Sequence, residues 1–234
     1  GSVDATTVTV AAGSTIAGTL TATTVTASSA NLAAASDVTV TNLILTAAGD
    51  TLTLSGADAT VTGMIKGASD SRGVIAVAGT KVTFASVIGT AGATPDVMTI
   101  ADGKRAIIKN TANFVDRIDI ADGGELEIST DVTGGVVFTT DASFVEADVT
   151  GADTKIFMPT NLVGGESLVL FEIYTRTAAS DVSALADMNV ALQDTAITDY
   201  VGEYDGTDTD QLNVVATAKT AAATASELSV TKNM

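Results

Sequence analysis

The chain has 234 residues, of which 46% are apolar and 4% aromatic, and 28 acidic residues against 11 basic ones give it a formal net charge of -17. The mean hydropathy of +0.38 excludes wholesale disorder, because disordered chains combine low hydrophobicity with high charge. The absence of Cys and His excludes a disulfide framework, a thiolate or imidazole catalyst and an ordinary zinc site. The acidic balance, with Lys66 as the first basic residue, argues against a nucleic-acid partner.

Short segments from residue 3 to about residue 174 alternate apolar side chains with Thr, Ser or Ala. A period of two is typical of β-strands with one buried face. The breaks between these segments contain Gly, Asp, Asn or Ser, which are the residues that turns favour, as at 48–50 and 101–103. The clearest predicted strands are 7–10, 37–41, 51–54, 81–84, 97–100, 117–120, 125–128 and 136–139.

A repeated phrase favours a solenoid over other all-β folds. Ile-Ala-Asp-Gly at 100–103 recurs at 120–123, and a spacing of about 20 residues fits one coil of a β-helix. We therefore predict an all-β, right-handed parallel β-helix (β-solenoid) whose repeats span 3–167; the right-handed sense follows the general rule for parallel connections. A β-sandwich, which also has short alternating strands with frequent turns, is the alternative.

The sequence after residue 167 departs from the repeats. Residues 168–174 are apolar at successive positions, which predicts a strand buried on both faces. Together with a last strand at 212–216 they form a predicted C-terminal cap over 168–217. The Ala-rich residues 218–234 are interpreted as a short helical tail or helix-prone linker.

No apolar run approaches the ~20 residues that a membrane-spanning helix needs, so no membrane insertion by this segment is expected. Gly1 and Ser2 look like a cloning remnant, and we expect the chain to be a piece of a longer protein.

A resemblance to a known family lies in the Gly-rich Thr/Val/Ala strands, the phrase at 120–128 and the Ala-rich ending at 220–228. In these features the chain resembles the C-terminal part of autotransporter passenger domains, in particular those of rickettsial-type surface antigens. The resemblance implies a right-handed β-helix exported by type V secretion and displayed on the bacterial cell surface, in many cases as an adhesin. It also implies that the predicted cap is autochaperone-like and that the tail leads toward a membrane barrel.

Carboxylates on successive coils are the candidates for catalysis, because two carboxylates about 5 Å apart can act as an acid and a nucleophile. The candidates are Asp102, Asp122, Asp119 and Glu125. Asp102 and Asp122 precede Gly, however, where Asp is favoured because it hydrogen-bonds the backbone of a turn. We expect no enzymatic activity.

An acidic stretch near the C-terminus is the candidate metal site. Its oxygen donors suit calcium, although their spacing does not match an EF-hand, and a solvated acidic loop is the alternative. The candidate calcium ligands are Asp199, Glu203, Asp205, Asp208 and Asp210. No other cofactor is predicted.

Three further features have alternative interpretations. The basic cluster Lys104, Arg105 and Lys109 is expected to protect a strand edge from pairing, and contact with an acidic receptor or a sugar is the alternative. The five Phe residues between positions 114 and 171 are assigned to a thicker core. The loop at 69–73 interrupts the repeat and is a place where binding would evolve.

These observations predict a non-enzymatic, extracellular β-solenoid module that acts as a rigid stalk or adhesive surface. Its expected partners are a host receptor, a glycan or neighbouring copies of itself. The alternative function is a self-assembling extracellular matrix or surface-layer subunit, in which calcium could join the molecules.

Overall fold

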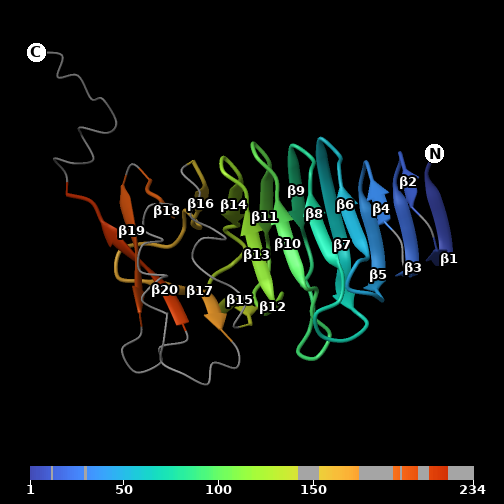
Figure 1. Cartoon of the computed structure of the whole chain (residues 1–234). Helices are drawn as coiled ribbons and strands as arrows, with labels where there is room; N and C mark the ends of the chain where they lie inside the picture. The colour runs from blue at the N-terminus through green and yellow to red at the C-terminus, as the bar shows by residue number, and fades with distance from the viewer. Residues whose placement is uncertain are drawn as a thin grey trace, which may run out of the picture.

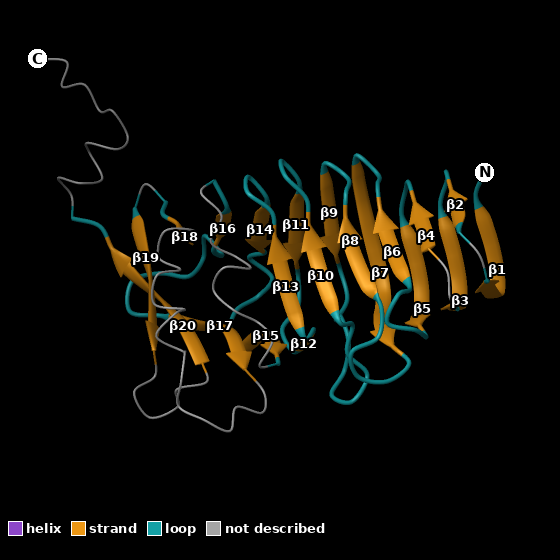
Figure 2. Ribbon diagram, in the orientation of Figure 1, coloured by secondary structure: helices purple, strands orange, loops and turns teal. Residues whose placement is uncertain are grey.

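A computed structural model describes residues 1–11, 13–28, 31–141, 153–173, 192–195, 197–204 and 211–220. Within these ranges every regular element is a β-strand, and the strands form three sheets, two of which run along the molecule from the N-terminal end while the third lies in its C-terminal half (Figure 1). Figure 2 shows the strands stacked side by side, with the turns gathered along the edges of the stack.

The first sheet has nine strands and the second has six. In sheet order, the first consists of β1 (Val3–Val10), β3 (Leu20–Ala27), β5 (Val38–Leu45), β7 (Asp58–Gly67), β9 (Lys81–Phe84), β11 (Arg105–Ile108), β14 (Glu125–Ile128), β16 (Lys155–Phe157) and β18 (Leu192–Gln193). The second consists of β13 (Arg117–Ile120), β10 (Val97–Ile100), β8 (Val74–Val77), β6 (Thr51–Leu54), β4 (Asn31–Ala34) and β2 (Ser14–Ile16). The third consists of β12 (Asn113–Phe114), β15 (Val136–Thr140), β17 (Ser167–Ile173), β20 (Gln211–Ala218) and β19 (Thr198–Tyr204).

Each inner strand of the first two sheets pairs in parallel with a strand one coil earlier and one coil later. Ile100 lies opposite Ile120, which confirms the register inferred from the repeated phrase. Inward side chains consequently form continuous rows, such as Leu32, Leu52, Ile75, Met98 and Ile118, all of which are buried. The predicted parallel β-solenoid is confirmed, whereas its right-handed sense stays a prediction.

The long N-terminal strands bend where the coil turns from one face to the next. In β3 the buried residues Ala22 and Val25 are separated by two residues, Thr23 and Thr24, neither of which is buried. The same spacing separates Val40 from Leu43 in β5. A strand with strict alternation would bury every second residue, so this spacing marks the corner.

Coil length is not constant, although neighbouring strands stay in register. Val3 pairs with Leu20, Arg105 with Glu125 and Ile156 with Leu192, so the offset between paired residues differs widely from coil to coil. The spacing predicted from the repeated phrase therefore describes the coil in which it was found and not the whole molecule.

The parallel pattern ends in the third sheet. There, β20 pairs antiparallel with both β17 and β19, so the C-terminal strands form a hairpin-like addition to the solenoid. The expectation that the strand at 168–174 is buried on both faces is wrong, because Val169 and Glu172 are only partly buried. The register shift between Val169 and Phe171 explains why Leu170 and Phe171 are both buried.

The last part of the chain falls mostly outside the structure. Ala218 ends β20, and residues 221–234 of the predicted tail are not among the described residues. The division of the chain at 167 and 217 stays a prediction.

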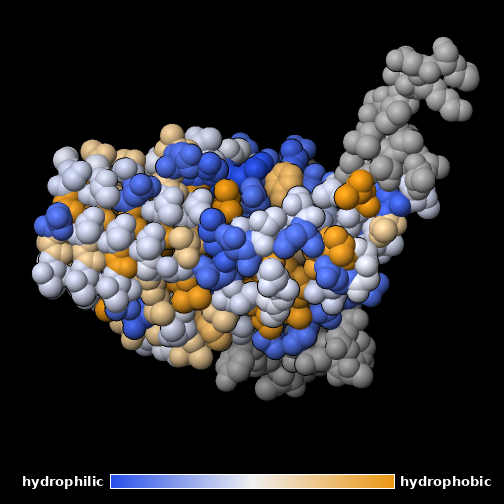
Figure 3. Space-filling model, turned by 180° about the vertical axis from the view of Figure 1, so that it is seen from behind, coloured by the Kyte–Doolittle hydropathy of each residue, from blue (hydrophilic) through white to orange (hydrophobic). Residues whose placement is uncertain are grey.

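Large apolar side chains are sparse on the surface that the structure describes. Figure 3 shows apolar residues as scattered spots on one face, with strongly hydrophilic residues denser toward the middle and the C-terminal part. The large exposed apolar side chains of the described residues are Val163, Ile197 and Val201. Within the described ranges there is no helix with the length and apolar character required to span a membrane.

Candidate functional site

A row of charged side chains crosses the outer face of the nine-stranded sheet. Asp58, Lys81, Arg105, Glu125 and Lys155 occupy one register row on five neighbouring strands. Lys81 Nζ lies 3.0 Å from Asp58 Oδ2, and Lys155 Nζ lies 3.9 Å from Glu125 Oε1. Three of the four neighbouring pairs in this row join opposite charges, whereas Lys81 and Arg105 place like charges side by side, so the row favours the observed coil order only in part.

Arg105, a member of that row, contacts two carboxylates and an aromatic ring. Its Nε donates a hydrogen bond of 2.6 Å to Glu125 Oε2, and its Nη1 lies 3.0 Å from Glu127 Oε2. Burial lowers the pKa of Arg105, but the hydrogen bond and charge of Glu125, followed by those of Glu127, raise it by more. The guanidinium carbon also lies 4.7 Å from the ring centroid of Phe157, a cation–π distance.

The interpretation of Lys104, Arg105 and Lys109 as protection for a strand edge is wrong. Strand β11 lies inside the sheet, where β9 and β14 pair with its two sides. Lys109 Nζ instead forms an ion pair of 3.2 Å with Asp131, one coil further on. Arg105 and Lys109 thus connect neighbouring coils.

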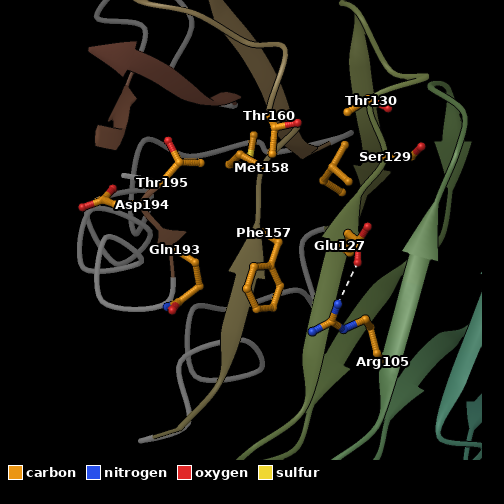
Figure 4. A pocket seen from close by; sticks show the side chains of 11 residues that line it. Arg105, Glu127, Ser129, Thr130, Phe157, Met158, Thr160, Gln193, Asp194 and Thr195 are labelled. Atoms are coloured by element: carbon orange, nitrogen blue, oxygen red, sulfur yellow. Dashed lines mark hydrogen bonds and ion pairs between the residues drawn. The ribbon is translucent and has the colours of Figure 1, made fainter. Parts of the chain in front are cut away.

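A pocket of about 320 Å³ opens beside Arg105, between β14 and β18 (Figure 4). We call it the Arg105 pocket. Glu127, Phe157 and Gln193 occupy one register row across its floor, with Phe157 between the other two. Its lining consists of Arg105, Glu127, Ile128, Ser129, Thr130, Phe157, Met158, Thr160, Gln193, Asp194 and Thr195.

The wall of the Arg105 pocket at Asp194 and Thr195 is fixed by β19. Asp194 Oδ1 accepts a hydrogen bond of 2.8 Å from the amide of Tyr200, and Thr195 Oγ1 accepts one of 3.0 Å from the amide of Thr198. The buried Tyr200 hydroxyl donates to the carbonyl oxygen of Pro159 on the neighbouring coil. Burial and then the charge of Asp194 raise the pKa of Tyr200, so its hydroxyl stays protonated and keeps this bond.

A second pocket of about 410 Å³ lies beside the loops at 68–73 and 90–95. We call it the Asp116 pocket, because Asp116, one of its lining residues, is only 6% exposed. Ser71 donates a short hydrogen bond to Asp116 Oδ2, and Thr94 also hydrogen-bonds this carboxyl group. Asp116 therefore joins two loops from earlier in the chain, including the loop at 69–73 that interrupts the repeat.

Burial raises the pKa of Asp116, and the charges of Asp141 and Asp70 add to this effect, although the bonds from Ser71 and Thr94 oppose it. The folded protein therefore holds the Asp116 proton to a higher pH than the unfolded chain does. Stability from this group is present at low pH and is lost as the pH rises through the folded pKa.

We expect Asp116→Asn to remove this dependence. The variant should be at least as stable as the parent at pH 7.5. As the pH falls toward about 4, the free energy of unfolding of the parent should rise relative to that of the variant. Urea unfolding of both proteins across this range measures the difference. A parent that instead loses stability relative to the variant on acidification would contradict the assignment.

The four carboxylates considered for catalysis have structural roles or ordinary strand positions. Asp122 Oδ1 accepts a hydrogen bond of 2.7 Å from the amide of Asp153 in the next coil. Glu125 pairs with Arg105, and Asp119 lies on β13 in register with Thr99. Asp102 lies in the turn at 101–103, and its carboxylate lies close to Gly123 one coil away.

The predicted calcium ligands fall only partly within the structure. Asp205, Asp208 and Asp210 are not among the described residues. Asp199 and Glu203 both lie on β19, four positions apart, which places them about 13 Å apart along the strand. Asp199 Oδ1 also lies 3.2 Å from Lys219 Nζ, and the calcium site stays a prediction. No group of three or more acidic residues among the described ones is arranged to hold a metal ion.

Sequence reasoning missed the Arg105 pocket because it assigned the Phe residues to the core. Phe138 and Phe171 are buried and stack with their ring centroids 5.9 Å apart, as expected for core residues. Phe157 instead lies on the outer face and lines the pocket. The alternation of inward and outward side chains along β16 indicates this position, because Phe157 follows the inward-facing Ile156 and therefore points outward.

Comparison with known proteins does not assign the chain to a family: no protein-family model, curated protein or solved structure matches it.

Proposed function

We propose that this chain is a non-enzymatic module of a secreted or cell-surface protein of the autotransporter-like class, where it serves as a rigid stalk with an adhesive outer face. The observation that carries the proposal is the unbroken parallel ladder from β1 to β18, with the Arg105 pocket on its outer face. A stack of paired coils keeps its length under load, since each coil is hydrogen-bonded to both neighbours.

Composition also supports an exported chain. The absence of Cys removes thiols that could be trapped in an oxidising compartment before folding is complete. Export in an unfolded state suits a solenoid, because each coil folds onto the one before it as the chain emerges.

Bead adhesion tests the adhesive role. Beads coated with the purified chain should bind eukaryotic cells several-fold more than albumin-coated beads, because the Arg105 pocket opens to solvent on the outer face of the nine-stranded sheet. Antibodies against the chain should also label intact cells of the organism that encodes it. Equal binding of both kinds of bead, or labelling only after the cells are lysed, would contradict the proposal.

Solution behaviour distinguishes a stalk from a self-assembling subunit. A stalk module stays monomeric at high concentration with or without calcium, which analytical ultracentrifugation measures. Filaments that form when calcium is added and dissolve in chelator would favour the matrix or surface-layer alternative.

A further inference from the structure

The Arg105 pocket combines one aromatic ring with a rim of hydrogen-bonding groups. Phe157 is only partly buried, so part of its apolar surface is accessible from the pocket. Beside it on the same register row lie a carboxylate, Glu127, and an amide, Gln193 (Figure 4). Hydroxyl groups complete the rim, from Ser129, Thr130, Thr160 and Thr195.

The charge of the pocket disfavours an anionic ligand. Arg105 is the one cationic residue in the lining, all of which is described, and its guanidinium is already paired with Glu125 and Glu127. Glu127 and Asp194 are acidic, and the whole chain carries a net charge of -17. An incoming carboxylate or sulfate would therefore meet repulsion without a free cation to offset it.

The pocket is also preorganised. Ion pairs and the cation–π contact hold Arg105, Glu127 and Phe157 in place, and hydrogen bonds from β19 hold Asp194 and Thr195. A volume of about 320 Å³ is at the lower end of the range for small-ligand sites. Binding there would order few protein side chains, which lowers its entropic cost.

We propose that the Arg105 pocket binds a neutral saccharide. A pyranose ring has an apolar C–H face that can pack on Phe157 on the side of the ring that Arg105 does not cover, and hydroxyl groups around its edge that can donate to Glu127 and Asp194 and accept from Gln193. The inference rests on the proposed adhesive function, for which it names the ligand class.

A glycan array that carries neutral, sialylated and uronate-containing oligosaccharides tests the site with the fluorescently labelled full chain. We expect retention on a subset of the neutral glycans and none on the anionic ones. The apparent Kd for the retained glycans should rise about tenfold in Phe157→Leu, which keeps an apolar side chain but removes the ring, and by a similar factor in Gln193→Ala.

Thr83→Ala is the matched control, because Thr83 lies in the same register row as Phe157 but on β9, outside the pocket. It should bind as the parent does. Thermal unfolding of each variant checks that the fold is intact, and Gln193→Ala serves alone if Phe157→Leu does not fold. Failure to retain any neutral glycan, preference for anionic glycans, or unchanged binding by the folded variants would overturn the proposal.

The bead assay separates this inference from the adhesive function. If Phe157→Leu binds glycans on the array as the parent does and its beads also adhere as well as the parent's, the saccharide site is refuted and the adhesive role is left intact. Retention of neutral glycans on the array by a chain whose beads do not adhere to cells would support the site and refute the adhesive role.

Discussion

Asn113→Ala should destabilise the protein by about 3 to 5 kcal/mol, because three backbone groups lose their partner at once. Asn113 is fully buried, and its Oδ1 accepts a hydrogen bond of 2.9 Å from the amide of Ile88. Its Nδ2 donates to the carbonyl oxygens of Asn110 and Val137, at 2.8 and 2.9 Å. The side chain thus joins the coil before it to the coil after it. Urea unfolding followed by circular dichroism measures the loss.

Asn161→Ala is the matched control for this change. Asn161 Nδ2 also bonds a backbone carbonyl of a neighbouring coil, that of Thr130, but it does so at an exposed position. Water can replace that bond, so the expected cost is below about 1 kcal/mol. Similar losses in the two variants would show that the buried contacts of Asn113 do not carry the effect.

Gly63→Ala should destabilise the protein by more than about 3 kcal/mol. Gly63 has a φ of 108°, which side chains of L-residues rarely adopt, and an added Cβ would lie 1.6 Å from the carbonyl oxygen of Val40. Relief requires movement of the β5 backbone near the register shift between Thr39 and Asn42. Thermal unfolding should show a markedly lower Tm, and a Tm indistinguishable from the parent's would contradict this account.

Gly49→Ala provides the comparison. Gly49 lies in the turn at 46–50, has no positive φ, and an added Cβ would have no heavy atom within 4 Å. Alanine there reduces the freedom of the unfolded chain without strain in the folded one, so the expected change is below about 1 kcal/mol in either direction.

The strands were predictable where alternation is strict. Lys81–Phe84 and Glu125–Ile128 bury every second side chain, and both were expected from the sequence. The corner in β3 was not predicted, because Thr23 and Thr24 break the period of two without a Gly or Pro to mark the bend. The bulge in β17 was mistaken for a strand buried on both faces for the same reason.

Part of the Arg105 pocket was also within reach of the sequence. The offset between Ile100 and Ile120 in the repeated phrase also places Arg105 directly opposite Glu125, so the ion pair follows from the repeat. The rest did not follow, since Phe157 and Gln193 reach their row through much longer coils. No constant period relates positions on coils of such different length.

Because the coils differ in length, the pairing of the strands does not depend on how many residues connect them. Val3 pairs in register with Leu20 and Ile156 pairs in register with Leu192, although far more residues separate the second pair, so the backbone ladder does not depend on coil length. Insertions and deletions between paired strands can therefore alter what the molecule presents to its surroundings at little cost in folding free energy. Such a scaffold can diversify its exterior over evolution while it retains the same interior.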